Sequence, residues 1–244
     1  MSAFCAVYIR EILILKRRIT RQIASMAISP LLYVLTFGYA LGASLTVGGR
    51  PYLEFLIPGL VAMNSMTQSF AIATEINVAR FYFHAFEEFQ AAPVSNLSYV
   101  LGETLAGLTK ALLSIAIVLL IAALFGVRLH YGPAFWLAIL LNSFAFASLA
   151  VAMALIVKSH ADQTLLTTFI ITPMGFLGGT FFPLDKLPSW AQGILSILPL
   201  SHASTAVRRA AFGEPAQLLP FIILLIFCAI FFTLAVFTVG KARN

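Results

Sequence analysis

Long apolar stretches separated by charged residues dominate the chain. A helix needs about 20 apolar residues to cross the hydrocarbon core of a bilayer, so the distance between successive charges locates the candidate spans. Residues 97–125 are apolar apart from Glu103 and Lys110. Five further stretches contain no Asp, Glu, Lys or Arg: residues 22–49, 55–74, 129–157, 163–184 and 215–240. The pattern predicts an all-α polytopic membrane protein with six transmembrane helices.

Residues 180–214, between the fifth and sixth expected spans, have a different composition. Prolines and amides at this density would leave backbone groups unsatisfied in lipid, which is tolerated only beside protein or a watery cavity. We therefore expect short external re-entrant helices here, and residues 187–207 are either re-entrant or interfacial. The residues that mark this region are Phe182, Pro183, Pro188, Trp190, Pro199 and Arg208.

Residues 1–22 are too charged to cross the membrane but have an amphipathic pattern. Tyr8, Ile12, Leu15 and Ile19 recur at helical spacing, which predicts one apolar face. The basic residues Arg10, Arg17 and Arg21 fall on the opposite face, toward anionic headgroups. We expect an interfacial helix that either anchors the topology or docks against a cytoplasmic partner.

Residues 78–96 form the longest connection on the cytoplasmic side. Aromatic residues repeat every three positions around an acidic pair, and a proline ends the helix that they predict. Such a helix fits a groove on a soluble partner; the alternative is a helix resting on lipid, which the acidic pair disfavours beside an anionic leaflet. The residues concerned are Phe83, Phe86, Glu87, Glu88, Phe89 and Pro93.

Composition and charge support a membrane protein and set its orientation. Hydrophobic residues make up 61% of the chain and charged residues only 10%, too few to cover a soluble exterior. The net charge of +6 does not indicate nucleic acid, because most of the chain lacks the water-facing surface that a basic patch needs. With six spans, nine basic residues lie on the side of the termini and five on the other, which predicts cytoplasmic termini.

No motif in the sequence carries catalytic chemistry. There is no Walker motif, the four histidines are far apart, and Cys5 and Cys228 stand at opposite ends of the chain, so we expect no enzyme activity, metal site or cofactor. Among the ionisable residues near membrane depth, Glu103 and Lys110 share a helical face, and with Glu75 they either form a proton or substrate path or pair within the bundle.

Two pairs of glycines have the small-xxx-small spacing that permits close helix packing. These are Gly38 with Gly42 in the first expected span, and Gly175 with Gly179 in the fifth. Packing within the subunit is the simpler role, and a dimer seam is the alternative.

Three stretches of the chain resemble the ABC-2 type permeases, the membrane subunits of ATP-binding-cassette exporters. Residues 52–60, YLEFLIPGL, are similar to the family's entry to the second span. Glu87-Glu88 followed by APVS and Leu101-Gly102 resemble its cytoplasmic coupling segment. Residues 178–213, with GGTFFP and LPSWAQ, resemble the region before the last span. Leu198 and the Ala85-Phe86 pair depart from the family's pattern.

The resemblance implies a six-helix subunit that forms a dimer, expected to be a homodimer, with each half on a separate ATPase subunit. Two copies of that ATPase would supply ATP and its magnesium, and residues 83–93 would be the coupling helix. The first and fifth spans would face the dimer seam and substrate path in the cytoplasmic (inner) membrane of a bacterium. Among family branches, the short loops look closest to drug and nodulation-factor exporters, whose cargo is hydrophobic or lipid-linked.

Two other classes remain open from the sequence. A stand-alone secondary transporter or small channel would use Glu103 and Lys110 as its working groups. A non-transporting membrane scaffold is favoured only if the chain has no ATPase partner.

Overall fold

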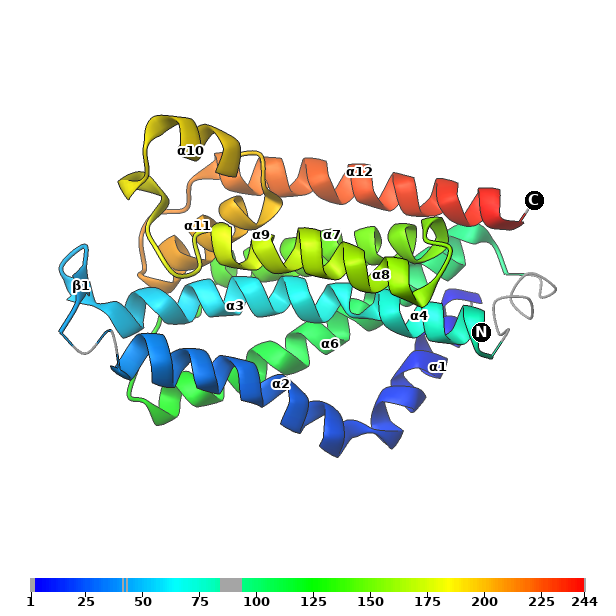
Figure 1. Ribbon diagram of the computed structural model, residues 1–244, viewed down its shortest axis with the longest axis horizontal. Coiled ribbons are helices and arrows are strands. Elements are labelled where there is room, and N and C mark those ends of the chain that lie inside the picture. The colour runs from blue at the N-terminus through cyan, green and yellow to red at the C-terminus, as the bar shows by residue number, and fades with distance from the viewer. Residues whose placement is uncertain (1–2, 41, 43, 84–93, 244) are drawn as a thin grey trace.

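The computed structural model describes residues 3–40, 42, 44–83 and 94–243. Helices run side by side along the long axis of an elongated bundle, and both termini lie at the same end (Figure 1). A two-stranded antiparallel hairpin, β1 (Thr46–Val47) with β2 (Arg50–Pro51), marks the opposite end. Gly48 and Gly49 form its turn with φ of +59° and +77°, a conformation that favours glycine at both positions.

Five helical stretches are long and apolar enough to cross a membrane: Ile19–Ala40, Tyr52–Phe81, Asn96–Leu124, Pro133–Ile156 and Leu218–Ala242. The first comprises α2 (Ile19–Tyr33) and the π-helical η1 (Val34–Ala40), and the second comprises α3 (Tyr52–Phe70) and α4 (Ile72–Phe81). The others are α6 (Asn96–Leu124), α7 (Pro133–Ile156) and α12 (Leu218–Arg243). These five correspond to expected spans one, two, three, four and six.

The fifth expected span takes a different form. Residues 160–177 are helical but divided into α8 (His160–Leu166), η2 (Thr167–Ile171) and α9 (Thr172–Leu177). Pro173 explains the π-helical turn, because its ring would clash with a carbonyl four residues earlier in a regular α-helix. The helix ends before Gly179, where φ is +80°, rather than continuing to residue 184. This stretch is not among the five candidate spans.

The stretch formed by α3 and α4 is the centre of the bundle. Of its most apolar window, 83% is buried, against 22% for the first span and 28% for α12. The hydroxyl groups of Ser65 and Ser69 in α3 make hydrogen bonds within their own helix, to carbonyls three or four residues earlier. Asn142 of α7 then donates to Ser65 Oγ at 2.6 Å and to the Ala62 carbonyl at 3.1 Å. The core is therefore apolar with a polar link between its two most buried helices.

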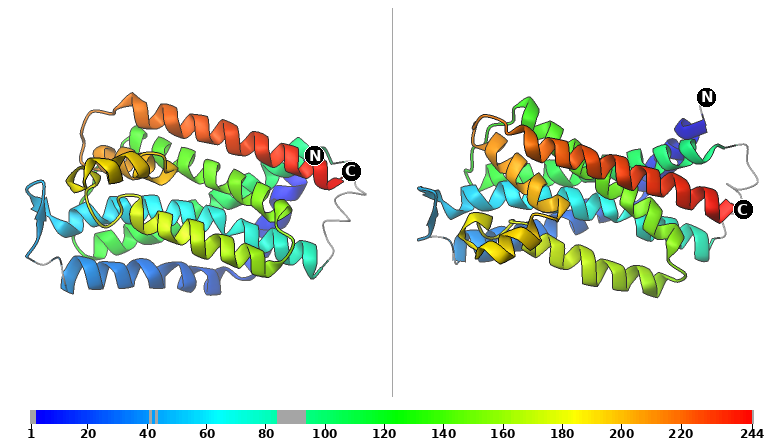
Figure 2. Two further views of the ribbon diagram at one scale, coloured as in Figure 1. Left: turned by 45° about the horizontal axis from the view of Figure 1, so that its top comes forward. Right: turned by 90° about the horizontal axis from the view of Figure 1, so that it is seen from above.

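The N-terminal helix differs from the single helix expected over residues 1–22. Helix α1 (Ala3–Arg17) ends at a break at Arg18, and Arg21 lies in the first turn of α2. Its buried positions are Val7, Glu11 and Leu15, which share one face four residues apart. Because α1 packs that face along α6 whereas α2 runs along the bundle axis, the chain must turn between them (Figure 2).

The remaining elements lie at the end of the bundle that carries the hairpin. They are η3 (Leu184–Lys186), α10 (Ser189–Leu195) and α11 (Pro199–Ala211). In Figure 1, α10 sits outside the bundle beside the start of α12, and α11 packs within it. On the other end, the expected segment 78–96 is partly helical already, because α4 extends to Phe81.

Candidate functional site

Of the expected coupling residues, the structure describes Phe83, which lies at the end of the bundle that carries both termini. Phe83 follows α4 with 70% of its surface exposed. Phe86, Glu87, Glu88, Phe89 and Pro93 lie outside the described residues. The helix expected over these residues therefore stays a prediction.

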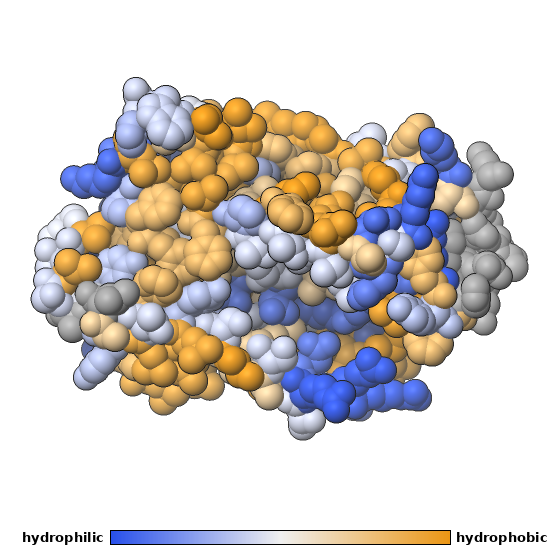
Figure 3. Space-filling view, in the orientation of Figure 1, coloured by the Kyte–Doolittle hydropathy of each residue, from blue (hydrophilic) through white to orange (hydrophobic). Residues whose placement is uncertain are grey.

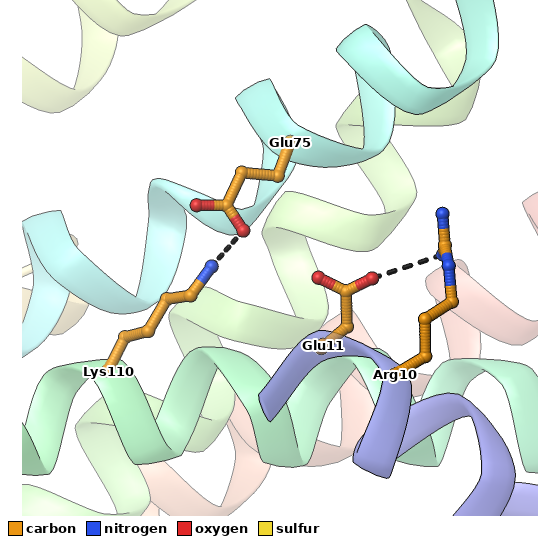
Figure 4. A network of polar contacts seen from close by, with 4 residues as sticks. All are labelled: Arg10, Glu11, Glu75 and Lys110. Atoms are coloured by element: carbon orange, nitrogen blue, oxygen red, sulfur yellow. Dashed lines mark hydrogen bonds and ion pairs between the residues drawn. The ribbon is translucent and has the colours of Figure 1, made fainter. Parts of the chain in front are cut away.

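Near the same end, two helices and α1 bring four charged side chains together, as Figure 4 shows. We call Arg10, Glu11, Glu75 and Lys110 the charged cluster. Lys110 of α6 forms an ion pair with Glu75 of α4, and its side chain is only 4% exposed. Arg10 Nη1 donates to Glu11 Oε1 at 3.1 Å. Lys110 therefore pairs within the bundle, which is one of the two interpretations that the sequence left open.

Glu11 shows the electrostatic cost of this arrangement. Burial raises the pKa of its carboxyl, the nearby Arg10 and Lys110 charges lower that pKa, and the Glu75 carboxylate raises it further. Glu103, on the same face of α6 as Lys110, is also buried, and its Oε2 has no hydrogen-bond partner among the described residues. The charged cluster therefore places the buried Glu11 carboxyl of α1 within electrostatic reach of the Lys110–Glu75 ion pair.

The three arginines expected on one interfacial face lie on two helices, Arg10 and Arg17 on α1 and Arg21 on α2. Arg10 belongs to the charged cluster and pairs with Glu11, whereas Arg17 and Arg21 are exposed. Helix α1 also packs tightly on α6, since a Cβ at Gly102 would lie 2.6 Å from Val7 Cβ. Docking of α1 against its own bundle was missed by both sequence-based alternatives for this helix.

At the opposite end, Arg208 of α11 joins three segments. Its Nη2 donates to the Gly179 carbonyl at 2.7 Å, and its guanidinium lies 3.8 Å from the centroid of the Phe55 ring on α3. A Cβ at Gly59 would lie 2.5 Å from the Thr180 oxygen, so the turn packs directly on the α3 backbone. Tyr52 completes this junction by donating to the Phe181 carbonyl at 2.7 Å.

The other marker residues of segment 180–214 surround this junction. Phe182 and Pro183 lead into η3, Pro188 precedes α10, and Pro199 opens α11, where a missing N–H is tolerated. Trp190 projects from α10 with 70% of its surface exposed. A cavity of about 520 Å³ opens between these elements, lined by residues that include Asp185, His202, Arg208 and Arg209.

The two glycine pairs pack within the chain. A Cβ at Gly38 would lie 2.4 Å from Leu53 Cδ1, and one at Gly42 would lie 2.5 Å from Tyr52 Cδ1, so both bring the first span onto α3. Gly175 lies on α9 against Met63, and Gly179 supplies the turn after it. Each of the four glycines thus lies against a residue of the same chain, and their role at a dimer seam stays a prediction.

A polar pocket lies between the first span, α3 and α9. Its volume is about 220 Å³, and hydroxyl and amide side chains line it halfway along the bundle: Ser25, Ser29, Asn64, Thr67, Gln68 and Thr172. Figure 3 shows this side of the molecule as pale and blue surface between hydrophobic patches. The sequence-based predictions did not include this pocket, although Ser25 with Ser29 and Asn64 with Gln68 repeat at four-residue spacing inside apolar spans.

Aromatic rings close this pocket toward the hairpin end. Tyr33 and Phe176 line it, and Phe181 stacks on Phe176 with centroids 5.1 Å apart. Phe37 and Phe181 are 5.0 Å apart, and Tyr33 meets Phe181 edge-on at 5.3 Å. We call Tyr33, Phe37, Phe176 and Phe181 the aromatic cluster.

A helical bundle with five stretches that could cross a membrane and a polar pocket between its helices is the architecture of a polytopic membrane protein. Comparison with known proteins gives the family: the model of the ABC-2 type transporter matches residues 2–212, and this chain belongs to that family. It is a membrane permease subunit; this subunit of the family carries no ATPase domain and no cofactor of its own, which agrees with the lack of a Walker motif. Membership implies a partner ATPase.

Individual relatives agree with this assignment. The chain is 31% identical to Nodulation protein J of Sinorhizobium fredii over 215 residues, which cover 86% of this chain and 81% of the relative. It is 32% identical to Nodulation protein J of Rhizobium meliloti over 213 residues, with the same coverage. The Inner membrane transport permease YadH of Escherichia coli is 26% identical over 252 residues, which cover 99% and 96% of the two chains.

Proposed function

We propose that two copies of this chain pair in the cytoplasmic membrane of a bacterium and export a hydrophobic or lipid-linked substrate. Energy comes from ATP hydrolysed by two copies of a separate ATPase subunit. The observation that carries the proposal is the polar pocket beside Ser29 and Thr172. Asn64, Thr67 and Thr172 donate to backbone carbonyls of their own helices. Lipid offers no such partner to Ser25, Ser29 and Gln68, so a substrate path or a second subunit should cover this side.

The proposed subunit has six spans, with residues 160–177 as the fifth. Five crossings would leave the termini on opposite faces of the membrane, whereas both termini lie at one end of the bundle (Figure 1). A helix of this length extends roughly 27 Å at 1.5 Å per residue, close to the hydrocarbon thickness of about 30 Å. The excess of basic residues at that end supports cytoplasmic termini.

Residues 180–214 are proposed as the external re-entrant region. The Arg208 junction supports this role, because it ties the segment to α3 through the backbone carbonyl and the ring of Phe55 instead of leaving it in solvent. In this arrangement the aromatic cluster closes the outer end of the path. An apolar barrier of four rings suits a hydrophobic cargo better than an ion.

At the cytoplasmic end, residues 83–93 are proposed to dock on the ATPase, and Phe83, Glu87 and Glu88 are the side chains that would enter its groove. Closure of the paired ATPases then moves these segments and shifts the two bundles between arrangements. Glu88→Arg should leave the subunit inserted and dimeric while uncoupling ATP hydrolysis from export.

Cross-linking and copurification test the pairing and the partner. In a background with Cys5→Ser and Cys228→Ser, Ser29→Cys should give a dimer with a bifunctional maleimide, since Ser29 is exposed beside the pocket. Leu225→Cys on α12 is the matched control and should stay monomeric; the native Leu225 side chain is likewise exposed, at 53%. The tagged chain should copurify with an ATPase subunit. Proton-driven transport by the isolated chain would instead establish a stand-alone transporter.

A further inference from the structure

One side chain, Arg80, joins the cytoplasmic ends of α4 and α7. Its Nη1 lies 3.1 Å from the Ala154 carbonyl, 3.3 Å from that of Leu155 and 3.3 Å from that of Val157. The last carbonyls of an α-helix lack partners within the helix and carry the negative end of its dipole. A guanidinium from α4 therefore caps the end of α7, both by hydrogen bonding and by charge.

One turn before Arg80, the same face of α4 also holds α8. Asn77 Nδ2 donates to Gln163 Oε1 at 3.0 Å, and the two residues are 0% and 1% exposed. The remaining amide atoms, Asn77 Oδ1 and Gln163 Nε2, have no other hydrogen-bond partner among the described residues. Each amide thus depends on the other, because leaving one buried without its partner is costly.

A third contact follows at the end of α4. The Tyr82 ring meets the His160 ring edge-on at 6.5 Å between centroids, and His160 opens α8. Arg80 therefore contacts the end of α7, and Asn77 and Tyr82 contact α8, on the two sides of the turn that joins these helices. We call these three residues the α4 grip. That turn is short and internally bonded: Asp162 N–H donates to Ser159 Oγ at 3.1 Å, and Lys158 N–H donates to Asp162 Oδ2 at 3.3 Å.

The position of the α4 grip links the two sites proposed above. Helix α4 ends at Phe81, immediately before the proposed ATPase-docking residues, while α8 continues through η2 into α9, which lines the polar pocket. Resting on the proposed function, we propose that Arg80 is a positioning residue that passes movement of residues 83–93 to the α7–α8 turn. The α8–η2–α9 helix then shifts against the first span when the ATPases close.

A cap that only stabilises the fold would predict something different. Removing it would lower stability or yield, but a correctly assembled variant would move normally when nucleotide is trapped. The discriminating measurement is therefore the movement of η2 per trapped nucleotide, rather than activity alone.

For the experiment, Phe169→Cys on η2, where the native side chain is 71% exposed, carries a bimane label in the background lacking Cys5 and Cys228. The complex of labelled chain and copurified ATPase is trapped with ATP and vanadate, and the emission shift is measured against trapped nucleotide. Arg80→Gln should remove most of the shift per trapped nucleotide, because a neutral amide cannot replace the charged hydrogen bonds to the α7 carbonyls. Arg80→Lys should be intermediate, because its ammonium lacks the guanidinium fork.

Matched variants separate the grip from its surroundings. Lys158→Gln removes a positive charge from the same turn, where Lys158 is exposed, and should leave the shift unchanged. Asn77→Leu should reduce it, whereas the exchange Asn77→Gln with Gln163→Asn keeps an amide pair and should restore at least half of it.

If Arg80→Gln traps nucleotide normally and shows the same bimane emission shift as the wild type, the proposal is wrong. If Arg80→Gln does not assemble, Arg80→Lys decides: a reduced shift with normal trapping supports the role, and an unchanged shift overturns it. Failure of the wild-type chain to bind an ATPase would instead contradict the proposed function, so the two failures are distinguishable.

Discussion

Arg208 donates a hydrogen bond to the carbonyl of Gly179 at 2.7 Å while its guanidinium lies over the ring of Phe55. These contacts hold α11 against the turn that follows α9 and against α3. Arg208 is thus one of the residues, with Tyr52 and Gly59, that fix the proline-containing region 180–214 to the best-buried helix. Several consequences can be measured.

Truncation of Arg208 should destabilise the end of the bundle that carries the hairpin. Arg208→Ala removes a charged hydrogen bond of about 1.5–3 kcal/mol and a cation–π contact of about 1 kcal/mol, so thermal unfolding in detergent should shift downward. The unfolding temperature of Arg208→Lys should lie between those of the wild type and Arg208→Ala. Lys186→Ala, at an exposed residue of η3, is the control, and an equal shift in both alanine variants would contradict this account.

Substitution of Gly59 should be as damaging, for a steric reason. The new Cβ in Gly59→Ala would lie 2.5 Å from the Thr180 backbone oxygen, so the turn or the helix must move, at a cost of about 1–3 kcal/mol. Gly193→Ala on α10 meets nothing within 4 Å and is the matched control. Accumulation in the membrane and the unfolding midpoint should fall for the first variant only; tolerance of both would refute the close packing.

The ion pair between Lys110 and Glu75 should behave as a coupled unit. Lys110→Met leaves the Glu75 carboxylate without its partner, and Glu75→Gln leaves a lysine that is only 4% exposed without its counter-charge. The double variant should be more stable than the sum of the two losses predicts, by about 1–3 kcal/mol in a double-mutant cycle. Additive losses in urea unfolding would show that the pair contributes nothing.

The attachment of α1 should weaken as the pH rises. Burial raises the pKa of Glu11 above its ordinary value of 4.5, so the docked helix favours the neutral carboxyl. That contribution is fully present below the ordinary value and is lost as the pH rises through the raised pKa. Trypsin cleavage at the exposed Arg17 and Arg18, normalised to a peptide substrate, should therefore increase with pH in the wild type. Glu11→Gln should remove this dependence; a wild-type rate that falls with pH would show the opposite sign.

The spans could be placed closely from the sequence because a charge-free stretch is a local property. Helix α6 begins and ends one residue before the stretch expected for it, since its apolar run is bounded by polar residues and a turn. The form of the stretch expected as the fifth span was harder to predict, because Pro173 and Gly179 act through backbone geometry that average hydrophobicity does not record. The division of residues 1–22 was also missed, because Arg18 breaks the helix without glycine or proline.

By itself, the sequence determined that this protein is helical, membrane-embedded and without an ATP-binding motif, because length, apolarity and motifs are all local properties. Only the tertiary structure decided which polar side chains meet. Glu75 and Lys110 are 35 positions apart, Asn77 and Gln163 are 86 apart, and Arg208 reaches Gly179 across 29. Helical periodicity places each residue on a face of its own helix, but packing of several helices at once selects the face that it meets.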